Sequence, residues 1–252
     1  MYDNERYDKI LEILKEKKKV TVDKLVKELY ISPATARRDL EAMSKKGLLK
    51  RVHGGAVLFS SSNEESSLFI REELNKKEKR EICEKAVFFI QSNQSIFLDS
   101  SSTVLHLVPL LNQFKSLTLV TNGLSTAMAI KNNTTFRAFI PGGFIQNQSN
   151  SVFGHTTINE LQNLFVNICI ISCAGFDFNQ GITEASIEQA EIKRTMIKNS
   201  SKRILLVDSS KFGKSFISKI CNINDINTII TDKNISQEYV DKIKELGIEL
   251  VY

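Results

Sequence analysis

Apolar residues recur every three or four positions through residues 4–46, which is the spacing of a buried helix face. The pattern predicts three short helices, over residues 4–17, from just after Thr21 to residue 29, and over residues 33–46. Ser32 is expected to cap the third helix, because its side chain can accept a hydrogen bond from first-turn amides and Pro33 suits the first helical position. The predicted core positions of this region are Tyr7, Ile10, Leu11, Leu14, Val22, Leu25, Val26, Leu29, Ala36, Leu40 and Met43.

The second and third helices are separated by a turn of about three residues, which is typical of a helix-turn-helix motif. We place this motif over residues 20–39. Gly47 is positioned to end the third helix, and residues 48–59 follow as two short strands joined by a Gly-Gly turn. The pattern therefore predicts a winged helix-turn-helix domain over residues 1–57.

Basic and hydroxyl side chains gather at the start of the third helix and along the wing. The residues expected to contact DNA are Ser32, Thr35, Arg37, Arg38, Lys50, Arg51 and His53. The alternative is an ordinary solvated three-helix domain, in which Arg37 and Arg38 only form surface ion pairs.

Beyond a serine-rich and acidic stretch, expected to be a linker over residues 58–75, the hydrophobic pattern changes to short continuous apolar runs. Such runs are typical of strands buried on both faces, and helical segments lie between them. The alternation predicts an α/β domain over residues 76–252 with a Rossmann-like, mostly parallel sheet. The predicted strands are residues 96–98, 117–120, 137–140, 166–172, 203–207, 227–231 and 248–251, and the predicted helices are residues 76–91, 103–111, 124–131, 186–199 and 237–246.

Five of these strands are followed by loops rich in hydroxyl, amide or glycine residues. Ligands of open α/β sheets bind beyond the carboxyl ends of the strands, so the loops predict a shared pocket. The loop at residues 99–103 reads DSSST and precedes a helix, which suits a phosphate, and Lys211 would add a positive charge. Asp99, Asn122 and Asp177 are suited to bind sugar hydroxyls. Each loop alone is weak evidence, because strand-to-helix turns favour these residue types in any protein.

The excess positive charge of the chain lies in the predicted DNA-binding domain. Residues 1–58 contain 14 Lys and Arg against 9 Asp and Glu, and the rest of the chain contains 20 of each. The excess lies where contact with DNA phosphates would require it.

The chain has no apolar run near the ~20 residues of a membrane span, and its charged start lacks a signal-peptide core. We therefore expect a cytoplasmic protein without a membrane partner. The four cysteines lack the spacing of metal ligands and are expected to be buried free thiols. No metal, other cofactor or catalytic residue is assigned, since no acid–base pair stands out among the loops.

The string T-x-R-R-D-L at residues 35–40, followed by G-L-L-x-R-x-H-G-G-A at residues 47–56, carries a specific resemblance. It is similar to the winged N-terminal domain of the DeoR family of bacterial transcriptional regulators. Ala36 departs from the pattern, because the family usually has a branched aliphatic residue there.

The second half resembles the DeoR sensor domain, which looks like the folds of ribose-5-phosphate isomerase and glucosamine-6-phosphate deaminase and senses phosphorylated sugars. Ser101 stands where the family usually has glycine, and its Cβ would crowd a bound phosphate. Glu191 and Lys193 have an alternative as surface residues of a helix whose core face is Ile187, Ala190 and Ile197. The loops and the resemblance together give these candidate effector-binding residues: Asp99, Ser100, Ser101, Ser102, Thr103, Thr121, Asn122, Gly142, Gly143, Gly175, Asp177, Thr183, Glu191, Lys193 and Lys211.

The resemblance implies a sequence-specific DNA-binding regulator, expected to repress a sugar-utilisation operon and to respond to a phosphorylated sugar. The alternative is an enzyme like a sugar-phosphate isomerase or deaminase with an accessory DNA-binding module. The winged module favours the regulator. A homo-oligomer, dimer or tetramer, is expected because one short helix reads few base pairs.

Overall fold

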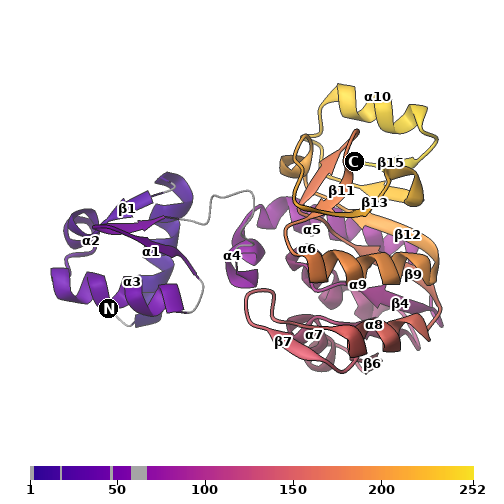
Figure 1. The fold of residues 1–252 in the computed structure, drawn as a ribbon, viewed down its shortest axis with the longest axis horizontal. Coiled ribbons are helices and arrows are strands. Elements are labelled where there is room, and N and C mark those ends of the chain that lie inside the picture. The colour runs from indigo at the N-terminus through magenta and orange to yellow at the C-terminus, as the bar shows by residue number, and fades with distance from the viewer. Residues whose placement is uncertain (1–2, 18, 46–47, 58–66) are drawn as a thin grey trace. The chain divides into compact units, whose positions relative to one another are not determined.

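A computed structural model of the chain describes residues 3–17, 19–45, 48–57 and 67–252. Its contacts divide the chain into two compact units, Met1–Arg71 and Glu72–Tyr252. Figure 1 colours the first unit from indigo to violet and the second from purple to yellow. The predicted linker overlaps this division. Its residues 58–66 lie outside the described part of the chain, and α4 (Leu68–Glu73) forms a helix where no element was predicted.

The first unit combines helices with a small antiparallel sheet. Its elements in chain order are α1 (Asp3–Lys17), β1 (Lys19–Thr21), α2 (Val22–Leu29), α3 (Pro33–Lys45), β2 (Lys50–Val52) and β3 (Gly55–Val57). Helices α1 to α3 and the wing strands β2 and β3 lie where the hydrophobic pattern predicted them. Strand β1 was not predicted, and it pairs with β3 to give the order β1-β3-β2. The predicted cap at Gly47 falls outside the described residues.

The apolar stripes of the three helices meet in one core. Ile10 and Leu14 from α1, Leu25 from α2, and Leu40 and Met43 from α3 are all fully buried. Burial of a side chain of this kind contributes about 1.5–3 kcal/mol, so these contacts are the main source of stability for a unit this small.

The second unit is built on a seven-stranded parallel sheet in the order β15-β14-β12-β9-β4-β5-β6. Each of the seven predicted apolar runs is one of its strands. The bounds are β4 (Ser95–Leu98), β5 (Thr118–Thr121), β6 (Arg137–Phe139), β9 (Val166–Ile171), β12 (Ser200–Leu206), β14 (Thr228–Ile230) and β15 (Glu249–Val251). Continuous apolar sequence forms these strands because helices cover both faces of the sheet.

Successive residues of the central strands point to opposite faces and enter different cores. Phe97 and Cys169 pack in one core with side chains of α8 (His155–Gln162), α9 (Ile187–Lys198) and α10 (Gln237–Glu245). Ile96 and Ile168 pack in the other core. That core also contains side chains of α5 (Lys76–Ala86), α6 (Ser102–Leu107) and α7 (Leu124–Asn133).

Two predicted helices end early and continue as tighter turns. Helix α5 stops at Ala86 and is followed by the 3-10 turn η1 (Val87–Phe89), where a helix to residue 91 was predicted. Helix α6 gives way to η2 (Val108–Gln113), which contains Pro109. Proline lacks the amide that an α-helix interior needs, which accounts for the change. Within the described residues, no helix combines the length and apolar character needed to span a bilayer.

Several short elements were missed by the sequence patterns. They are the hairpin β7 (Phe144–Gln146) and β8 (Ser151–Phe153), the small sheet of β10 (Gly175–Asp177), β11 (Gly181–Glu184) and β13 (Ser218–Cys221), helix α8, and the turns η3 (Ser209–Lys211) and η4 (Ile223–Asp225). Strands of three or four residues are too short to show a period of two. Their pairing depends on neighbours that are distant in sequence.

Candidate functional site

The third helix of the first unit begins at a side-chain cap. Ser32 Oγ accepts a hydrogen bond from the Thr35 amide at 3.1 Å and lies 2.9 Å from Thr35 Oγ1. Tyr30, in the left-handed conformation with φ +53°, ends α2 and turns the chain toward this cap. The predicted cap is therefore confirmed, and both hydroxyl groups are engaged locally while Ser32 stays exposed.

The two arginines expected to read DNA flank a buried carboxylate. Arg37 and Arg38 are exposed, whereas Asp39 is buried and receives two hydrogen bonds from the Arg6 guanidinium, Nε to Oδ2 at 2.8 Å and Nη2 to Oδ1 at 3.0 Å. This paired contact fixes α3 against α1, and no local sequence pattern predicts it. No carboxylate in the described residues pairs with Arg37 or Arg38, so the surface ion-pair alternative finds no support there.

The wing is a hairpin whose turn lies at His53 and Gly54. Gly54 has φ +74°, and Gly55 packs so closely on β1 that a Cβ would stand 2.1 Å from the Val20 carbonyl oxygen. Lys50 and His53 are exposed, as a phosphate-facing surface requires. Arg51 is half-buried and donates one hydrogen bond from Nη1 to the Gly55 carbonyl at 3.1 Å, so it braces the hairpin as well.

In the second unit, a buried charge cluster lies where β4, β9 and β11 end. Lys193 Nζ lies 3.1 Å from Asp99 Oδ2, contacts Glu184 Oε2, and donates to the Ser172 carbonyl at 2.9 Å. Burial alone would lower the pKa of Lys193, but the carboxylates of Glu184 and Asp99 outweigh burial and raise its pKa above the ordinary value. Glu184 and Ser172 are site residues that the sequence patterns missed.

The loop after β4 is folded inward and held by hydrogen bonds. Asp99 Oδ1 accepts from the Ser101 amide at 2.9 Å, and Ser101 Oγ accepts from the Val104 amide at 3.2 Å as the cap of α6. Residues 99–103 each expose 7% or less of their surface. Thr103 Oγ1 accepts from Ser172 Oγ at 3.4 Å. The predicted phosphate loop is therefore buried and closed by hydrogen bonds.

A buried lysine not recognised in the sequence reaches the same loop. Lys79 on α5 exposes 4% of its surface and donates from Nζ to Ser102 Oγ at 3.1 Å and to the Leu74 carbonyl at 2.7 Å. Its position in a helix with many lysines gives no hint of this role. The ammonium group adds a cation beside the hydroxyls of the loop.

Gln189 on α9 connects the loops that follow β4 and β5. Its Oε1 accepts from Ser100 Oγ at 2.9 Å and from Asn122 Nδ2 at 3.3 Å, and its Nε2 donates to Ser151 Oγ at 2.8 Å. Thr121 Oγ1 accepts from the Gly123 amide at 3.0 Å. The structure thus brings the predicted residues of the two loops together, and it adds Gln189 and Ser151.

The side-chain oxygen of Asn122 accepts no hydrogen bond from any described residue. Asn122 Oδ1 is buried, while Nδ2 donates to the Val152 carbonyl at 3.2 Å and to Gln189. Rotating the amide would aim the oxygen at two acceptors, so the network itself fixes the orientation. A buried acceptor left open in this way is suited to a hydroxyl donor.

Lys211 lies in a second polar loop, after β12. It is half-buried in η3, next to Asp208 and Ser209. Asp208 accepts a hydrogen bond from Asn75 Nδ2 at 2.9 Å, and the Ser209 amide donates to Asp232 Oδ2 at 2.7 Å. These contacts fix the loop. Among the described residues, no hydrogen bond or ion pair involves the Lys211 ammonium group.

Other predicted residues serve local structure. Asp177 Oδ1 accepts from the amides of Asn179 and Gln180, both at 2.9 Å, and so closes the β10–β11 turn. Thr183 Oγ1 donates to the Gly175 carbonyl at 3.3 Å. The amide of Gly142 donates to Glu160 on α8, and Gly143, with φ +148°, packs on Thr157 of the same helix.

Glu191 and Lys193, both candidate effector-binding residues, lie in different environments on α9. Glu191 is exposed on α9, and the carboxylate that meets Lys193 is Glu184. The alternative of two surface residues holds for Glu191 and fails for Lys193. Of the expected core face, Ala190 and Ile197 are buried as predicted, whereas Ile187 in the first turn is 57% exposed.

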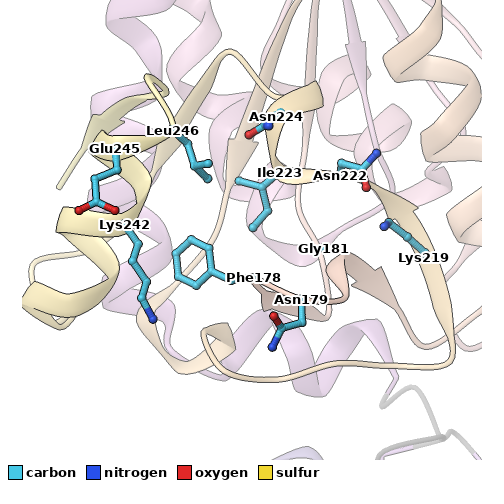
Figure 2. A pocket seen from close by; sticks show the side chains of 10 residues that line it. All are labelled: Phe178, Asn179, Gly181, Lys219, Asn222, Ile223, Asn224, Lys242, Glu245 and Leu246. Atoms are coloured by element: carbon cyan, nitrogen blue, oxygen red, sulfur yellow. The ribbon is translucent and has the colours of Figure 1, made fainter.

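A separate surface pocket lies between the β10–β11 turn, β13, η4 and α10 (Figure 2). Lys242 Nζ stands 5.3 Å from the centre of the Phe178 ring at its rim. None of the residues that line this pocket is among the candidate effector-binding residues. They are Phe178, Asn179, Gly181, Lys219, Asn222, Ile223, Asn224, Lys242, Glu245 and Leu246. Across the residues the structure describes, no cluster of His, Cys, Asp and Glu could hold a metal ion.

Comparisons with known proteins cover both units. A family model described as "DeoR-like helix-turn-helix domain" matches residues 6–62, and one described as "DeoR C terminal sensor domain" matches residues 74–233. The chain is 34% identical over 248 residues to the HTH-type transcriptional regulator GolR of Listeria innocua, covering 98% of both chains. It is 34% identical to the L-fucose operon activator of Haemophilus influenzae, covering 92% of this chain and 93% of the activator.

More distant relatives include the glycerol-3-phosphate regulon repressor of Escherichia coli, 28% identical with 92% of each chain covered. Among solved structures, ribose 5-phosphate isomerase A of Methanocaldococcus jannaschii aligns with a TM-score of 0.41 at 13% identity over 55% of each chain. The delta subunit of eIF2B from Chaetomium thermophilum aligns with a TM-score of 0.47 at 12% identity, covering 64% of this chain and 58% of that subunit.

The curated relatives named above are transcriptional regulators, and the two matched models describe a DNA-binding and a sensor domain. They do not favour the alternative of an isomerase or deaminase with an accessory module. With its winged helix-turn-helix unit and its sensor unit both matched, this chain belongs to the DeoR family of transcriptional regulators.

Proposed function

We propose that the chain is a cytoplasmic regulator of a sugar-utilisation operon, and that a phosphorylated sugar bound to its second unit controls its affinity for operator DNA. The DNA-reading side chains are Ser32, Thr35, Arg37 and Arg38 on or beside α3. Lys50, Arg51 and His53 on the wing contact phosphates. Support comes from the exposure of both arginines beside a buried Arg6–Asp39 pair that holds α3 in place.

The effector site is the set of buried polar groups at the carboxyl ends of β4, β5, β9 and β11. The observation that carries this proposal is the buried, highly polar character of the set. Lys193, Asp99 and Glu184 lie together, each with 5% or less of its surface exposed. Burial of three charged groups costs solvation free energy that pairing with one lysine offsets only in part, which supports a role in ligand binding. The unfilled acceptor of Asn122 lies in the same hydrogen-bonded network.

The charges of the site residues indicate where the sugar and the phosphate of the ligand bind. The cluster of one ammonium and two carboxylates carries a net charge of about −1, so it repels phosphate and suits sugar hydroxyls. Lys79 and the hydroxyls of Ser100 and Ser102 form the region where a phosphate gains charge-assisted hydrogen bonds. Lys211 supplies a second cation for the same group.

The loops are closed in this structure, so effector binding must exchange their internal hydrogen bonds for contacts with ligand. A ligand can shift the regulator only by binding one conformation more tightly than another. The expected action is repression that the effector relieves, although relatives include an activator as well as repressors.

A thermal-shift panel of pentose and hexose phosphates tests the proposal directly. Binding raises the melting temperature by mass action, so a true effector should stabilise the protein while its unphosphorylated sugar does not. Band shifts with an operator fragment, with and without the effector found, then give the sign of its action. A panel that produces no shift at millimolar concentration counts against the sensor proposal.

A further inference from the structure

A largely apolar surface lies at one edge of the seven-stranded sheet, in β6 and the segment that leads from it into β7. The exposed fractions are 42% for Phe139, 42% for Ile140, 73% for Phe144 and 61% for Ile145. We name these four residues, together with Arg137 and Ala138 of β6, the β6–β7 surface. Figure 1 shows β6 and β7 beside α7, whose Met128 is 53% exposed. None of these six residues was predicted to contact DNA or effector, although the candidate residues Gly142 and Gly143 lie between Ile140 and Phe144.

The β6–β7 surface is almost free of charge. From Asn132 to Asn159, Arg137 is the only Lys, Arg, Asp or Glu, although charged residues form 25% of the chain. Buried strands lack charge in every protein, but most of residues 137–148 are exposed. Depletion of charge combined with exposed aromatic residues is the mark of an interface centre, since an ordinary solvated surface favours Lys and Glu.

The backbone of β6 is open to a further strand. Among the described strands β6 pairs with β5 alone and ends the sheet, and all three of its residues are exposed. An edge strand offers unpaired amide and carbonyl groups that another chain can bind, unless charge or cover protects it. The opposite edge, β15, carries the exposed Glu249, whereas β6 carries Phe139.

We propose that the β6–β7 surface binds the same surface of a second copy of this chain in a symmetric dimer. Antiparallel pairing of β6 with its copy, centred on Ala138, sets Arg137 of each chain opposite Phe139 of the other. That arrangement places a guanidinium on an aromatic ring and avoids a pair of like charges. The surface is therefore complementary to itself, as a two-fold interface must be.

The amount of apolar area fits this partner. A fully exposed side chain of this size presents about 150–250 Å², so Phe139, Ile140, Phe144, Ile145 and Met128 together offer roughly 500 Å² at their exposures. A stable interface buries about 800 Å² per partner, which the paired strand backbones and flanking polar side chains can complete. The choice of a second copy also rests on the proposed function, because two-fold operators need two recognition helices.

The test is sedimentation velocity of the full chain over a range of protein concentrations, without DNA or effector. The parent should dimerise at micromolar concentration, and Phe144→Ser/Ile145→Ser should raise the dimer dissociation constant at least about tenfold. Phe88→Ser is the matched control, since Phe88 is 87% exposed in η1 and lies outside the surface. Thermal unfolding should show that all variants remain folded, because the replaced side chains are exposed.

A parent that stays monomeric would overturn the proposal, as would a dimer that the double variant leaves intact or that Phe88→Ser weakens equally. Phe139→Ser provides a second variant within β6 itself. Failure here is separable from failure of the proposed function, because operator binding is measured on a different unit and by a different assay. A dimer that depends on Phe144 and Ile145 but never binds DNA would retain the surface and reject the regulator.

Discussion

Lys193 Nζ lies 3.1 Å from Asp99 Oδ2, and the two side chains expose 5% and 0% of their surface. Asp99 opens the loop after β4, and Lys193 comes from the middle of α9, almost a hundred residues later. The pair therefore joins the predicted phosphate loop to α9, which packs on the opposite face of the sheet from α6. Glu184 adds a second carboxylate, so the lysine neutralises only part of the negative charge.

Replacing Lys193 should destabilise the second unit strongly. Lys193→Met removes the cation and leaves Asp99 and Glu184 buried without compensation, which typically costs about 3–5 kcal/mol. Urea denaturation monitored by circular dichroism measures the change. Glu191→Ala, on the same helix but exposed, is the control and should stay within about 0.5 kcal/mol of the parent. Equal stability of both variants would show that the cluster contributes little to the fold.

Replacing the arginines of α3 should weaken operator binding. Arg37→Ala and Arg38→Ala each remove an exposed guanidinium near the helix start, and a lost base contact costs about 1–3 kcal/mol. Band-shift titrations at fixed salt measure the effect. Lys45→Ala removes the same charge at the other end of the helix, where Lys45 pairs with Glu41, and should cost less. Unchanged affinity in the double arginine variant would exclude α3 as the reading helix.

The wing should contribute affinity without sequence preference. Arg51→Ala is expected to weaken binding to specific and random DNA by similar factors and to lower the slope of the salt dependence by about one. Arg51→Lys keeps the charge and should preserve the slope. The loss of the bond to the Gly55 carbonyl adds about 0.5–1.5 kcal/mol of instability, which thermal unfolding detects separately. Loss limited to the specific site would mean that Arg51 reads bases.

The predicted strands and the structure agree because each central strand is buried on both faces and is therefore apolar throughout. The hydrogen-bonded site was harder to predict. Lys79 and Lys193 sit in helices where lysine is common, and their burial depends on Ser102, Asp99 and Glu184, which the sheet brings near. Glu184 lies on β11, a strand too short to show a pattern. Sequence spacing alone could not distinguish buried Lys193 from exposed Glu191.

The last prediction concerns the two cations assigned to the effector phosphate. Lys79→Met and Lys211→Ala should each weaken binding of a sugar phosphate by about 1.5–3 kcal/mol, because each removes a charge-assisted contact. Calorimetry with the effector found in the thermal-shift panel measures the loss. Operator affinity without effector should stay nearly unchanged, since both residues belong to the second unit.

Lys242→Ala is the matched control for these two variants, because it removes an exposed lysine of the same unit from the rim of the other pocket (Figure 2). It should bind effector like the parent. In band shifts, both site variants should remain on operator DNA at effector concentrations that release the parent, if the regulator is a repressor. Should Lys79→Met and Lys211→Ala both respond to effector like the parent while Lys242→Ala does not, the effector binds in the pocket of Figure 2 and the assignment to the strand-end loops is wrong.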